Sequence, residues 1–236
     1  MAGGAALFSG GESGECGMTN ALVHKTGAAI QWARDYGQAH PKQRGIFWVA
    51  ISIIFLIIPA VFFDYTMNHL GKNVAELVVM LAIIPVMFAI QKEEARKILP
   101  KNIPILILCG ALPAVILVLS QNEMIIHGSV NDIPFHYYTA FMLNTAFIVP
   151  LYEEKLCRGL LLRGLESLLS RKVIAIVLTS MLFGVAHKGN ELVTFFHGLI
   201  MGYLACYQRI GAVERAVIHG SYNFAIFMYF VFHVIR

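Results

Sequence analysis

Two uninterrupted apolar runs constrain this chain more than any other feature of its sequence. Ile46–Phe63 and Ile103–Ser120 each contain 18 residues without a charged side chain. A helix of that length rises about 27 Å, close to the thickness of a bilayer's hydrocarbon core, about 30 Å. The sequence therefore predicts a transmembrane helix at each of the two places.

Less uniform apolar runs extend this pattern along the rest of the chain. The chain is 58% hydrophobic and 14% charged, whereas soluble domains average about 45–50% and about 25%. We therefore expect an all-α, polytopic integral membrane protein of about seven to eight helices. The further predicted helices are Val74–Ile90, Tyr137–Tyr152, Val173–His187, Leu192–Tyr207 and residues 213–236.

The N-terminal region differs from the remainder in composition. Residues 1–20 are rich in Gly and Ser and lack the apolar stretch of a signal peptide, so we expect a mobile tail. Residues 21–45 suit either a short interfacial helix around Trp32 or a loosely ordered leader. The predicted organisation is this tail over 1–45 and one transmembrane domain over 46–236, with scaffold helices in 46–134 and the polar motifs in 135–236.

The net charge of +4 reflects membrane topology and not a nucleic-acid partner. If the N-terminus is cytoplasmic, all but three of the 18 Lys and Arg residues fall on the cytoplasmic side, as the positive-inside rule requires. The exceptions are Lys72, Lys188 and Arg236. We therefore expect a multi-pass protein with a cytoplasmic N-terminus, in the cell membrane if the source is bacterial and in the endoplasmic reticulum if it is eukaryotic.

Adjacent glutamates, Glu153 and Glu154, follow the apolar run that begins at Tyr137. A charge within a membrane span costs about 2.5–3.5 kcal/mol on insertion scales, so such residues usually have a function. On a helix, Glu154 and Arg158 stand at i and i+4 in the order that favours an ion pair. Glu153 lies about 100° round the helix, on the face of Cys157, and is left free to react.

Two further helices bring polar side chains to the same level. If the chain turns after Ser170, Glu153 and His187 are both 17 positions from that turn and lie side by side in the hairpin. Phe183 precedes His187 by four residues and shares its face. His219 and Asn223 also share a face. His197, by contrast, is interpreted as a helix-packing residue, and Cys157 as a small apolar neighbour of the site.

These ordered motifs resemble those of a known family. Glu153-Glu154-x-x-x-Arg158, Phe183-x-x-x-His187 and His219-x-x-x-Asn223 are similar to the motifs of the CPBP (CAAX protease and bacteriocin-processing) intramembrane proteases, which include the Ras-converting prenyl-protein endopeptidase. The resemblance covers about residues 137–230. It implies a helical fold with an intramembrane cavity open to the cytoplasm, and peptide-bond hydrolysis. It also implies catalytic roles for the matching Glu153, Glu154, His187, His219 and Asn223. We assign Arg158, Phe183 and Cys157 as supporting residues, although Cys157 stands where many members of the family have an aromatic residue before the arginine.

The expected mechanism uses a water molecule activated by a glutamate. Glu153 is assigned as general base and His187 as the residue that orients the water, while His219 and Asn223 offer donors for the oxyanion. No cofactor is required in this interpretation. Zn²⁺ remains open, since Glu153, His187 and His219 are chemically suitable ligands, although no His-x-x-x-His pair occurs and Asn is a poor zinc ligand.

The expected partners are the bilayer and a membrane-anchored protein or peptide, either prenylated or carrying a C-terminal sorting tail. Two alternatives stay open at this point. A non-catalytic member of the same family would serve as a bacteriocin-immunity or scaffold protein. A proton-coupled transporter would also place Glu and His in the membrane, but it requires ionisable groups distributed across the membrane.

Overall fold

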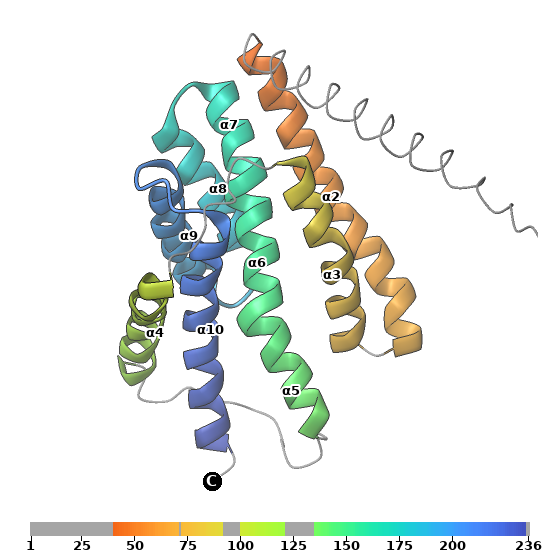
Figure 1. The fold of residues 1–236 in the computed structure, drawn as a ribbon, viewed down its shortest axis with the longest axis vertical. Helices are drawn as coiled ribbons and strands as arrows, with labels where there is room; N and C mark the ends of the chain where they lie inside the picture. The colour runs from red at the N-terminus through yellow and green to blue at the C-terminus, as the bar shows by residue number, and fades with distance from the viewer. Residues whose placement is uncertain (1–39, 71, 92–99, 121–134, 235–236) are drawn as a thin grey trace, which may run out of the picture. The chain divides into compact units, whose positions relative to one another are not determined.

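The computed structural model describes residues 40–70, 72–91, 100–120 and 135–234, and it is helical without a strand in these ranges. The predicted all-α class is therefore confirmed for the described residues (Figure 1). The chain divides into two compact units, Met1–Arg44 and Gly45–Arg236. The predictions for residues 1–39 and for residues 121–134 lie outside the described residues.

The described part of the chain consists of helical elements in the following order. The elements are α2 (Pro41–Leu70), α3 (Lys72–Ile90), η2 (Pro100–Asn102), α4 (Ile103–Ser120), α5 (Phe135–Leu143), η3 (Asn144–Ile148), α6 (Val149–Glu153), η4 (Glu154–Leu161), α7 (Leu162–Leu169), α8 (Lys172–Ala186), α9 (Glu191–Cys206) and α10 (Ala212–Val234).

Each predicted apolar run coincides with helical structure over its described residues, and most of the ends agree within a few residues. The run expected from Tyr137 to about Ser170 is one continuous helical stretch over residues 135–169. It includes two π segments, η3 and η4. The amide of Leu162 bonds the carbonyl of Cys157, five residues back, and that of Val149 bonds the carbonyl of Asn144. Such π segments are often found at functional sites.

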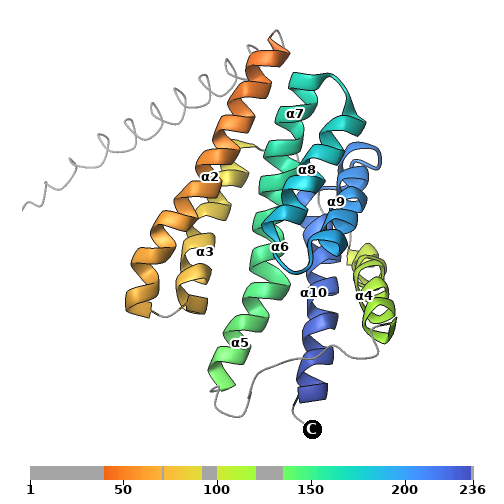
Figure 2. The ribbon, with the colours of Figure 1, turned by 180° about the vertical axis from the view of Figure 1, so that it is seen from behind.

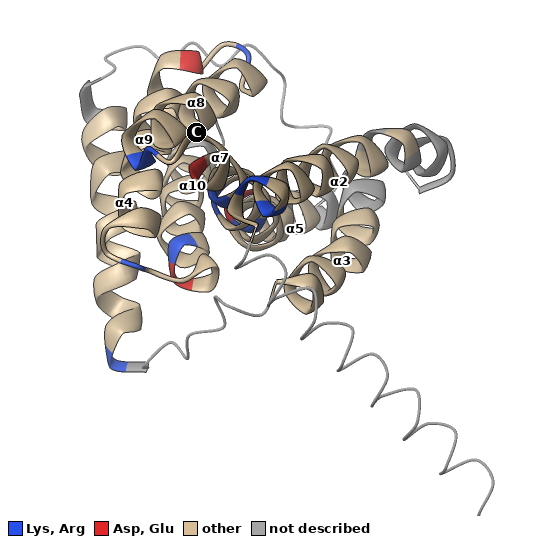
Figure 3. Cartoon of the chain, turned by 90° about the horizontal axis from the view of Figure 1, so that it is seen from above, with Lys and Arg blue, Asp and Glu red and all other residues tan. Residues whose placement is uncertain are grey.

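The helices differ in whether they are long enough to cross a bilayer. Among the described residues, Pro41–Pro59 in α2 has the length and hydropathy of a membrane span. Four other apolar helical stretches are shorter: Leu77–Ile90, Ile103–Val118, Lys172–Ala186 and Glu191–Cys206. A 15-residue helix rises only about 22 Å, so the α8–α9 hairpin is shorter than the hydrocarbon core of about 30 Å. Figure 3 shows that charged residues occupy few places on the ribbon.

Helix α10 is the element around which the polar motifs are arranged. It packs along α4 and against α6 and η3, while α8 pairs with α9 and with α7. Both views show α10 between α4 and the α5–α6 stretch (Figures 1 and 2). The outward side of α4 carries exposed apolar side chains such as Ile105, Leu108 and Ile116. Large apolar exposure of this kind is expected for a helix that faces lipid.

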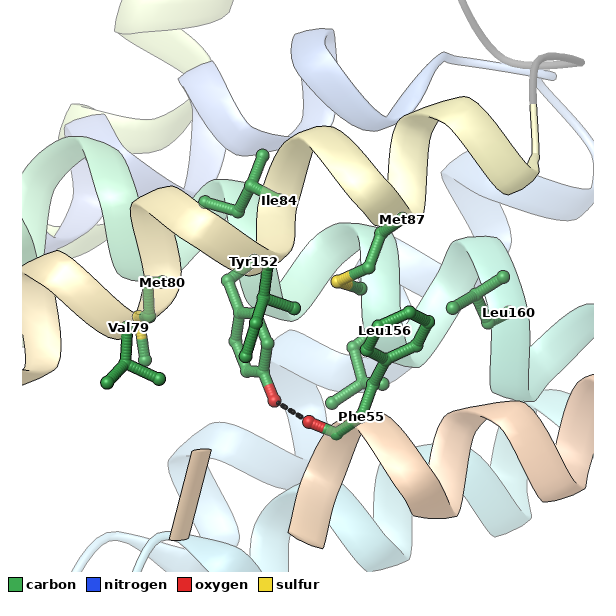
Figure 4. Close-up of a cluster of buried hydrophobic side chains, with 9 residues drawn as sticks. Phe55, Val79, Met80, Ile84, Met87, Tyr152, Leu156 and Leu160 are labelled. Carbon is green, nitrogen blue, oxygen red and sulfur yellow. Dashed lines mark hydrogen bonds between the residues drawn. The ribbon is translucent and has the colours of Figure 1, made fainter. Parts of the chain in front are cut away.

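A buried apolar cluster joins α2 and α3 to the stretch that carries the glutamates. Its central residues include Phe55, Met87, Tyr152 and Leu156 (Figure 4). The Tyr152 hydroxyl donates a hydrogen bond to the carbonyl oxygen of Phe55 over 2.6 Å. The predicted scaffold helices therefore hold Tyr152, which immediately precedes Glu153, by a fixed polar contact as well as by apolar packing.

Close approach of α10 to η3 depends on Gly220. A Cβ added at this residue would lie 2.0 Å from the carbonyl oxygen of Ala146. Alanine gains about 1 kcal/mol over glycine inside a helix, but this contact is with backbone and cannot be relieved by rotating a side chain. We therefore expect Gly220→Ala to destabilise the protein by about 1–3 kcal/mol, the usual range for overpacking, in thermal unfolding of the detergent-solubilised protein.

A matched control for this prediction is Ser221→Ala. The Ser221 hydroxyl donates to the carbonyl of Val217 in its own helix, over 2.7 Å, so its loss leaves the contact between helices unchanged. If Gly220→Ala unfolded at the same temperature as Ser221→Ala, α10 and η3 would not be held at the separation described.

Candidate active site

Glu153 lies between two imidazoles from different helices. Its Oε1 is 3.6 Å from Nε2 of His187, at the C-terminal end of α8, and its Oε2 is 3.7 Å from Nε2 of His219 on α10. Its side chain is 19% exposed. The structure thus brings together the carboxylate and both histidines that were predicted separately from the sequence. Both distances exceed a direct hydrogen bond and leave room for a shared water or a substrate group.

Glu154 points into the protein and is fully buried. One carboxylate oxygen, Oε1, is 3.2 Å from Nη1 of Arg158, and the other, Oε2, accepts a hydrogen bond from Nε of Arg215 over 3.1 Å. Nδ1 of His219 is 3.3 Å from Oε1. The i, i+4 pair predicted for Glu154 and Arg158 is therefore present. A second, unpredicted guanidinium completes the buried cluster.

The orientation of His187 is set by its own helix. Its Nδ1 is 2.7 Å from the carbonyl oxygen of Phe183. Since a carbonyl only accepts, Nδ1 carries the hydrogen, and the neutral ring presents the Nε2 lone pair to Glu153. The Phe183 ring lies 4.4 Å from that of His187, and the Arg158 guanidinium lies 4.2 Å from the centre of the Phe183 ring. Phe183 thus contacts both the histidine and the arginine, as its expected supporting role requires.

The chain reverses after His187 through a short polar turn. Gly189 adopts φ = +88°, a conformation that glycine reaches without steric cost. Its amide donates to Oε1 of Glu191 over 2.9 Å. Helix α8 ends at Ala186 and α9 starts at Glu191, so His187 is the capping residue at the C-terminal end of α8.

Asn223 and Cys157 occupy the edges of the site. Asn223 lies one turn after His219 on α10, and its amide donates to the carbonyl of Thr145 in η3 over 3.0 Å. The second hydrogen of that amide is available to another acceptor. Cys157 is a free, partly buried thiol, one turn after Glu153. The structure brings Arg158, His187 and His219 to the Glu153–Glu154 pair, Phe183 to His187 and Arg158, and Asn223 to Thr145 in η3.

Several buried polar residues at the site were not predicted from the sequence. Arg215 is fully buried, and its spacing of four residues before His219 places it on the face of a predicted site residue. That spacing is a signal that could have identified it. His197, assigned only to helix packing, has its ring 4.5 Å from the ring of His219. No spacing links His197 to any motif.

Lys155 and Gln91 form a second unpredicted contact, behind the glutamates. Lys155 donates to the carbonyl of Gln91 over 2.9 Å, and the Gln91 amide donates to the carbonyl of Gly159 over 2.6 Å. Both side chains are buried. The end of α3 is thereby attached to both ends of one turn of η4, the π segment that begins at Glu154.

The described residues include one candidate group of metal ligands. Among the described residues, one group of His, Cys, Asp or Glu has ligand atoms within 4.8 Å of one another: Glu154, His197 and His219. It differs from the predicted zinc set, Glu153, His187 and His219. Two guanidiniums already contact the Glu154 carboxylate and would repel a divalent cation. Neither set fits a zinc site well.

The described residues form an all-helical, apolar protein. A carboxylate and two imidazoles lie together on packed helices, an arrangement suited to acid–base chemistry. Residues 135–225 match the family model described as Rce1-like, type II CAAX prenyl endopeptidase. The resemblance drawn from the motifs is therefore confirmed for this segment of the chain. No curated protein and no solved structure matches the chain.

Proposed function

We propose that this protein is an intramembrane endopeptidase that cleaves the C-terminal tail of a prenylated, membrane-anchored substrate, using a water molecule activated by Glu153. The match to a family of CAAX prenyl endopeptidases supports both the reaction and the substrate class. The observation that carries the proposal is the position of Glu153 between Nε2 of His187 and Nε2 of His219. A partly buried carboxylate placed between two imidazoles can supply the acid–base catalysis that peptide hydrolysis requires.

The attacking water is placed by Glu153 and His187 together. Oε1 of Glu153 and Nε2 of His187 are both acceptors and stand 3.6 Å apart. A water can donate one hydrogen to each, which leaves an oxygen lone pair directed at the scissile carbonyl. As the carbon–oxygen bond forms, the water proton passes to Glu153, which later delivers it to the departing amine when the carbon–nitrogen bond breaks.

The negative charge that develops on the substrate carbonyl oxygen needs donors. His219 supplies an N–H at Nε2, and Asn223, one turn further on the same helix, supplies its second amide hydrogen. Removing one such donor usually lowers kcat about 10²- to 10³-fold. Glu154, held by Arg158 and Arg215, fixes the first residue of η4 and thereby the position of its neighbour Glu153.

The proposal includes membrane topology. The distribution of Lys and Arg favours a multi-pass chain whose active site opens towards the cytoplasm. The transporter alternative receives less support. The apolar stretches Leu77–Ile90 and Ile103–Ser120 contain no acidic, basic or histidine residue, whereas a proton pathway needs ionisable groups along its length.

The function is tested with purified full-length protein in liposomes. The substrate is a peptide with a prenylated cysteine three residues from its C-terminus, and the matched control is the same peptide without the prenyl group. We expect mass spectrometry to show release of the residues after the cysteine, and only from the prenylated peptide. Equal resistance of both peptides, or proton flux across the liposome membrane without cleavage, would contradict the proposal.

The proposed mechanism also predicts insensitivity to chelators. Glu154, the acid in the converging donor group found among the described residues, is already paired with two arginines, so we expect no resident divalent ion. Prolonged treatment with 1,10-phenanthroline should leave cleavage of the prenylated peptide within about twofold of the untreated rate. The matched control is the same treatment followed by added Zn²⁺. Loss of activity that zinc restores would establish a metal-dependent reaction instead.

A further inference from the structure

His197 is a partly buried histidine, with a buried Nε2 atom, that the proposed mechanism does not use. It lies on α9 with its ring 4.5 Å from that of His219, 5.3 Å from that of Tyr222 and 6.5 Å from that of Phe183. Its Nε2 is buried and has no hydrogen-bond partner among the described residues. A buried polar atom left in this state destabilises the folded protein. A role for this nitrogen would explain why the chain tolerates it.

Two other buried atoms, on the neighbouring residues His219 and Glu154, also lack a hydrogen-bond partner among the described residues. These atoms are Nδ1 of His219 and Oε1 of Glu154, which are only 3.3 Å apart. A ligand atom of each of the three residues lies within 4.8 Å of one of each of the others. Three separate helical segments thus bring polar side chains around one small volume, and each of these side chains has a buried atom without a hydrogen-bond partner among the described residues.

The chemistry of these atoms selects what can bind there. The carboxylate of Glu154 is already contacted by Arg158 and Arg215, and these positive charges disfavour a cation. A buried water typically makes about three hydrogen bonds to groups that otherwise lack partners. A water about 2.8 Å from each of two atoms bridges a gap of up to about 5 Å with a normal bond angle. The group matches a water better than a metal ion.

We propose that His197 is a positioning residue that, through one buried water, holds His219 in the tautomer with its hydrogen on Nε2. The donors and acceptors balance in this arrangement. Nε2–H of His197 donates to the water, and the water donates one hydrogen to Nδ1 of His219 and the other to Oε1 of Glu154. Because Nδ1 of His219 then accepts, the neutral ring carries its hydrogen on Nε2, facing Glu153 and the substrate.

This arrangement also resolves a conflict in the direct contact. If His219 is a neutral Nε2–H donor, Nδ1 and the carboxylate oxygen of Glu154 are both acceptors 3.3 Å apart, and they repel each other unless a donor is shared between them. The water supplies two hydrogens, and His197 fixes its orientation. The effect of this tautomer on catalysis rests on the proposed function, because the Nε2 hydrogen of His219 is the one assigned to stabilise the oxyanion. The proposed tautomer of His219 does not depend on that function.

The test uses full-length protein with ¹⁵N-labelled histidine in detergent micelles or nanodiscs. NMR of the imidazole nitrogens should show His219 protonated at Nε2 in the unmodified protein and mixed or reversed in His197→Leu. His197→Gln retains an N–H donor at a similar reach and should keep the original tautomer. His197→Phe, which fills the space between Phe183 and Tyr222, is a second variant without a donor and should behave as His197→Leu does.

Kinetics with the prenylated peptide give a second readout. We expect His197→Leu to lower kcat about 10- to 100-fold, the range in which partners that orient a histidine usually act, with KM unchanged. His197→Gln should restore kcat to within about threefold. An unchanged His219 tautomer in both donor-free variants would overturn the proposal, as would stoichiometric binding of Zn²⁺ that shifts the His197 and His219 signals. A tautomer change in protein that cleaves no peptide would uphold the link and reject only the proposed function.

Discussion

Glu153→Gln is expected to abolish cleavage of the prenylated peptide, with kcat reduced by at least about 10³-fold. Removal of a general base alone lowers a rate about 10²- to 10⁴-fold. The amide also replaces an oxygen that accepts the water's hydrogen with a group that is often a donor, so the water is misplaced as well. The measurement is single-turnover cleavage in liposomes, which separates the chemical step from substrate binding and product release.

The stability of the same variant should hardly change. Glu153 is partly exposed, and its two closest polar contacts, at 3.6 and 3.7 Å, are too long for hydrogen bonds whose loss would unfold the protein. Cys157→Ala is the matched control, since it alters a partly buried side chain one turn away on the same face and should retain most of the activity. Full cleavage by Glu153→Gln, or equal losses in both variants, would remove Glu153 from the role of base.

The helices and the contacts of the two glutamates with Arg158 and His187 were predictable, because they depend on patterns within one helix or one hairpin. Apolar runs bounded by polar residues gave α8 within one residue at each end: Val173–His187 was expected and Lys172–Ala186 is found. Spacing of four residues predicted that Glu154 would contact Arg158, and counting from the turn predicted that Glu153 would meet His187. In each case the geometry of one helix or one hairpin fixes the contact.

The contacts that the sequence did not reveal join residues far apart in the chain. Lys155 and Arg215 were counted with the cytoplasmic basic residues, yet both are buried, one against the carbonyl of Gln91 and the other against Glu154. Periodicity describes which residues share a face of one helix, but it contains no information on which face of another helix lies opposite. His197 illustrates the same limit, because its neighbours come from α8 and α10.

The π segments were unpredictable for a different reason. On an α-helix of 3.6 residues per turn, Glu154, Lys155 and Arg158 lie within an arc of about 100°, a charged face that periodicity alone predicts to be exposed. In η4 all three are buried, with Leu156, Gly159 and Leu160. The π segment adds a residue to the turn, and each of these side chains finds a partner on a different neighbouring element. Burial of the two bases therefore depends on tertiary packing and not on local propensity.

Arg215→Met is expected to cause the largest loss of stability of any substitution at the site. The guanidinium is fully buried, donates to Oε2 of Glu154, and also donates to the carbonyl of Ile210. Breaking a buried ion pair by removing one partner costs about 3–5 kcal/mol. Because Arg158 remains beside Glu154, we expect the lower end, about 3 kcal/mol. For a chain of this length, that lowers Tm by roughly 6–12 °C.

A second substitution separates the effect of unbalanced buried charge from the effect of lost side-chain packing. Glu153, Glu154, Arg158 and Arg215 provide two carboxylates and two guanidiniums; Arg215→Met leaves two carboxylates with one guanidinium. Glu154→Gln combined with Arg215→Met restores equal numbers. We therefore expect the double variant to unfold at a higher temperature than Arg215→Met alone, with a coupling energy of about 1–3 kcal/mol, as is usual for residues in one network.

The matched control is Arg171→Met, which removes an exposed arginine at the start of α8 and should change stability by less than about 0.5 kcal/mol. Thermal unfolding of all four proteins in the same detergent is the measurement. If Arg215→Met and Arg171→Met unfolded together, the buried pair with Glu154 would contribute nothing. If the double variant were less stable than Arg215→Met alone, the destabilisation would come from lost packing, and charge balance would not be what holds η4 against α10.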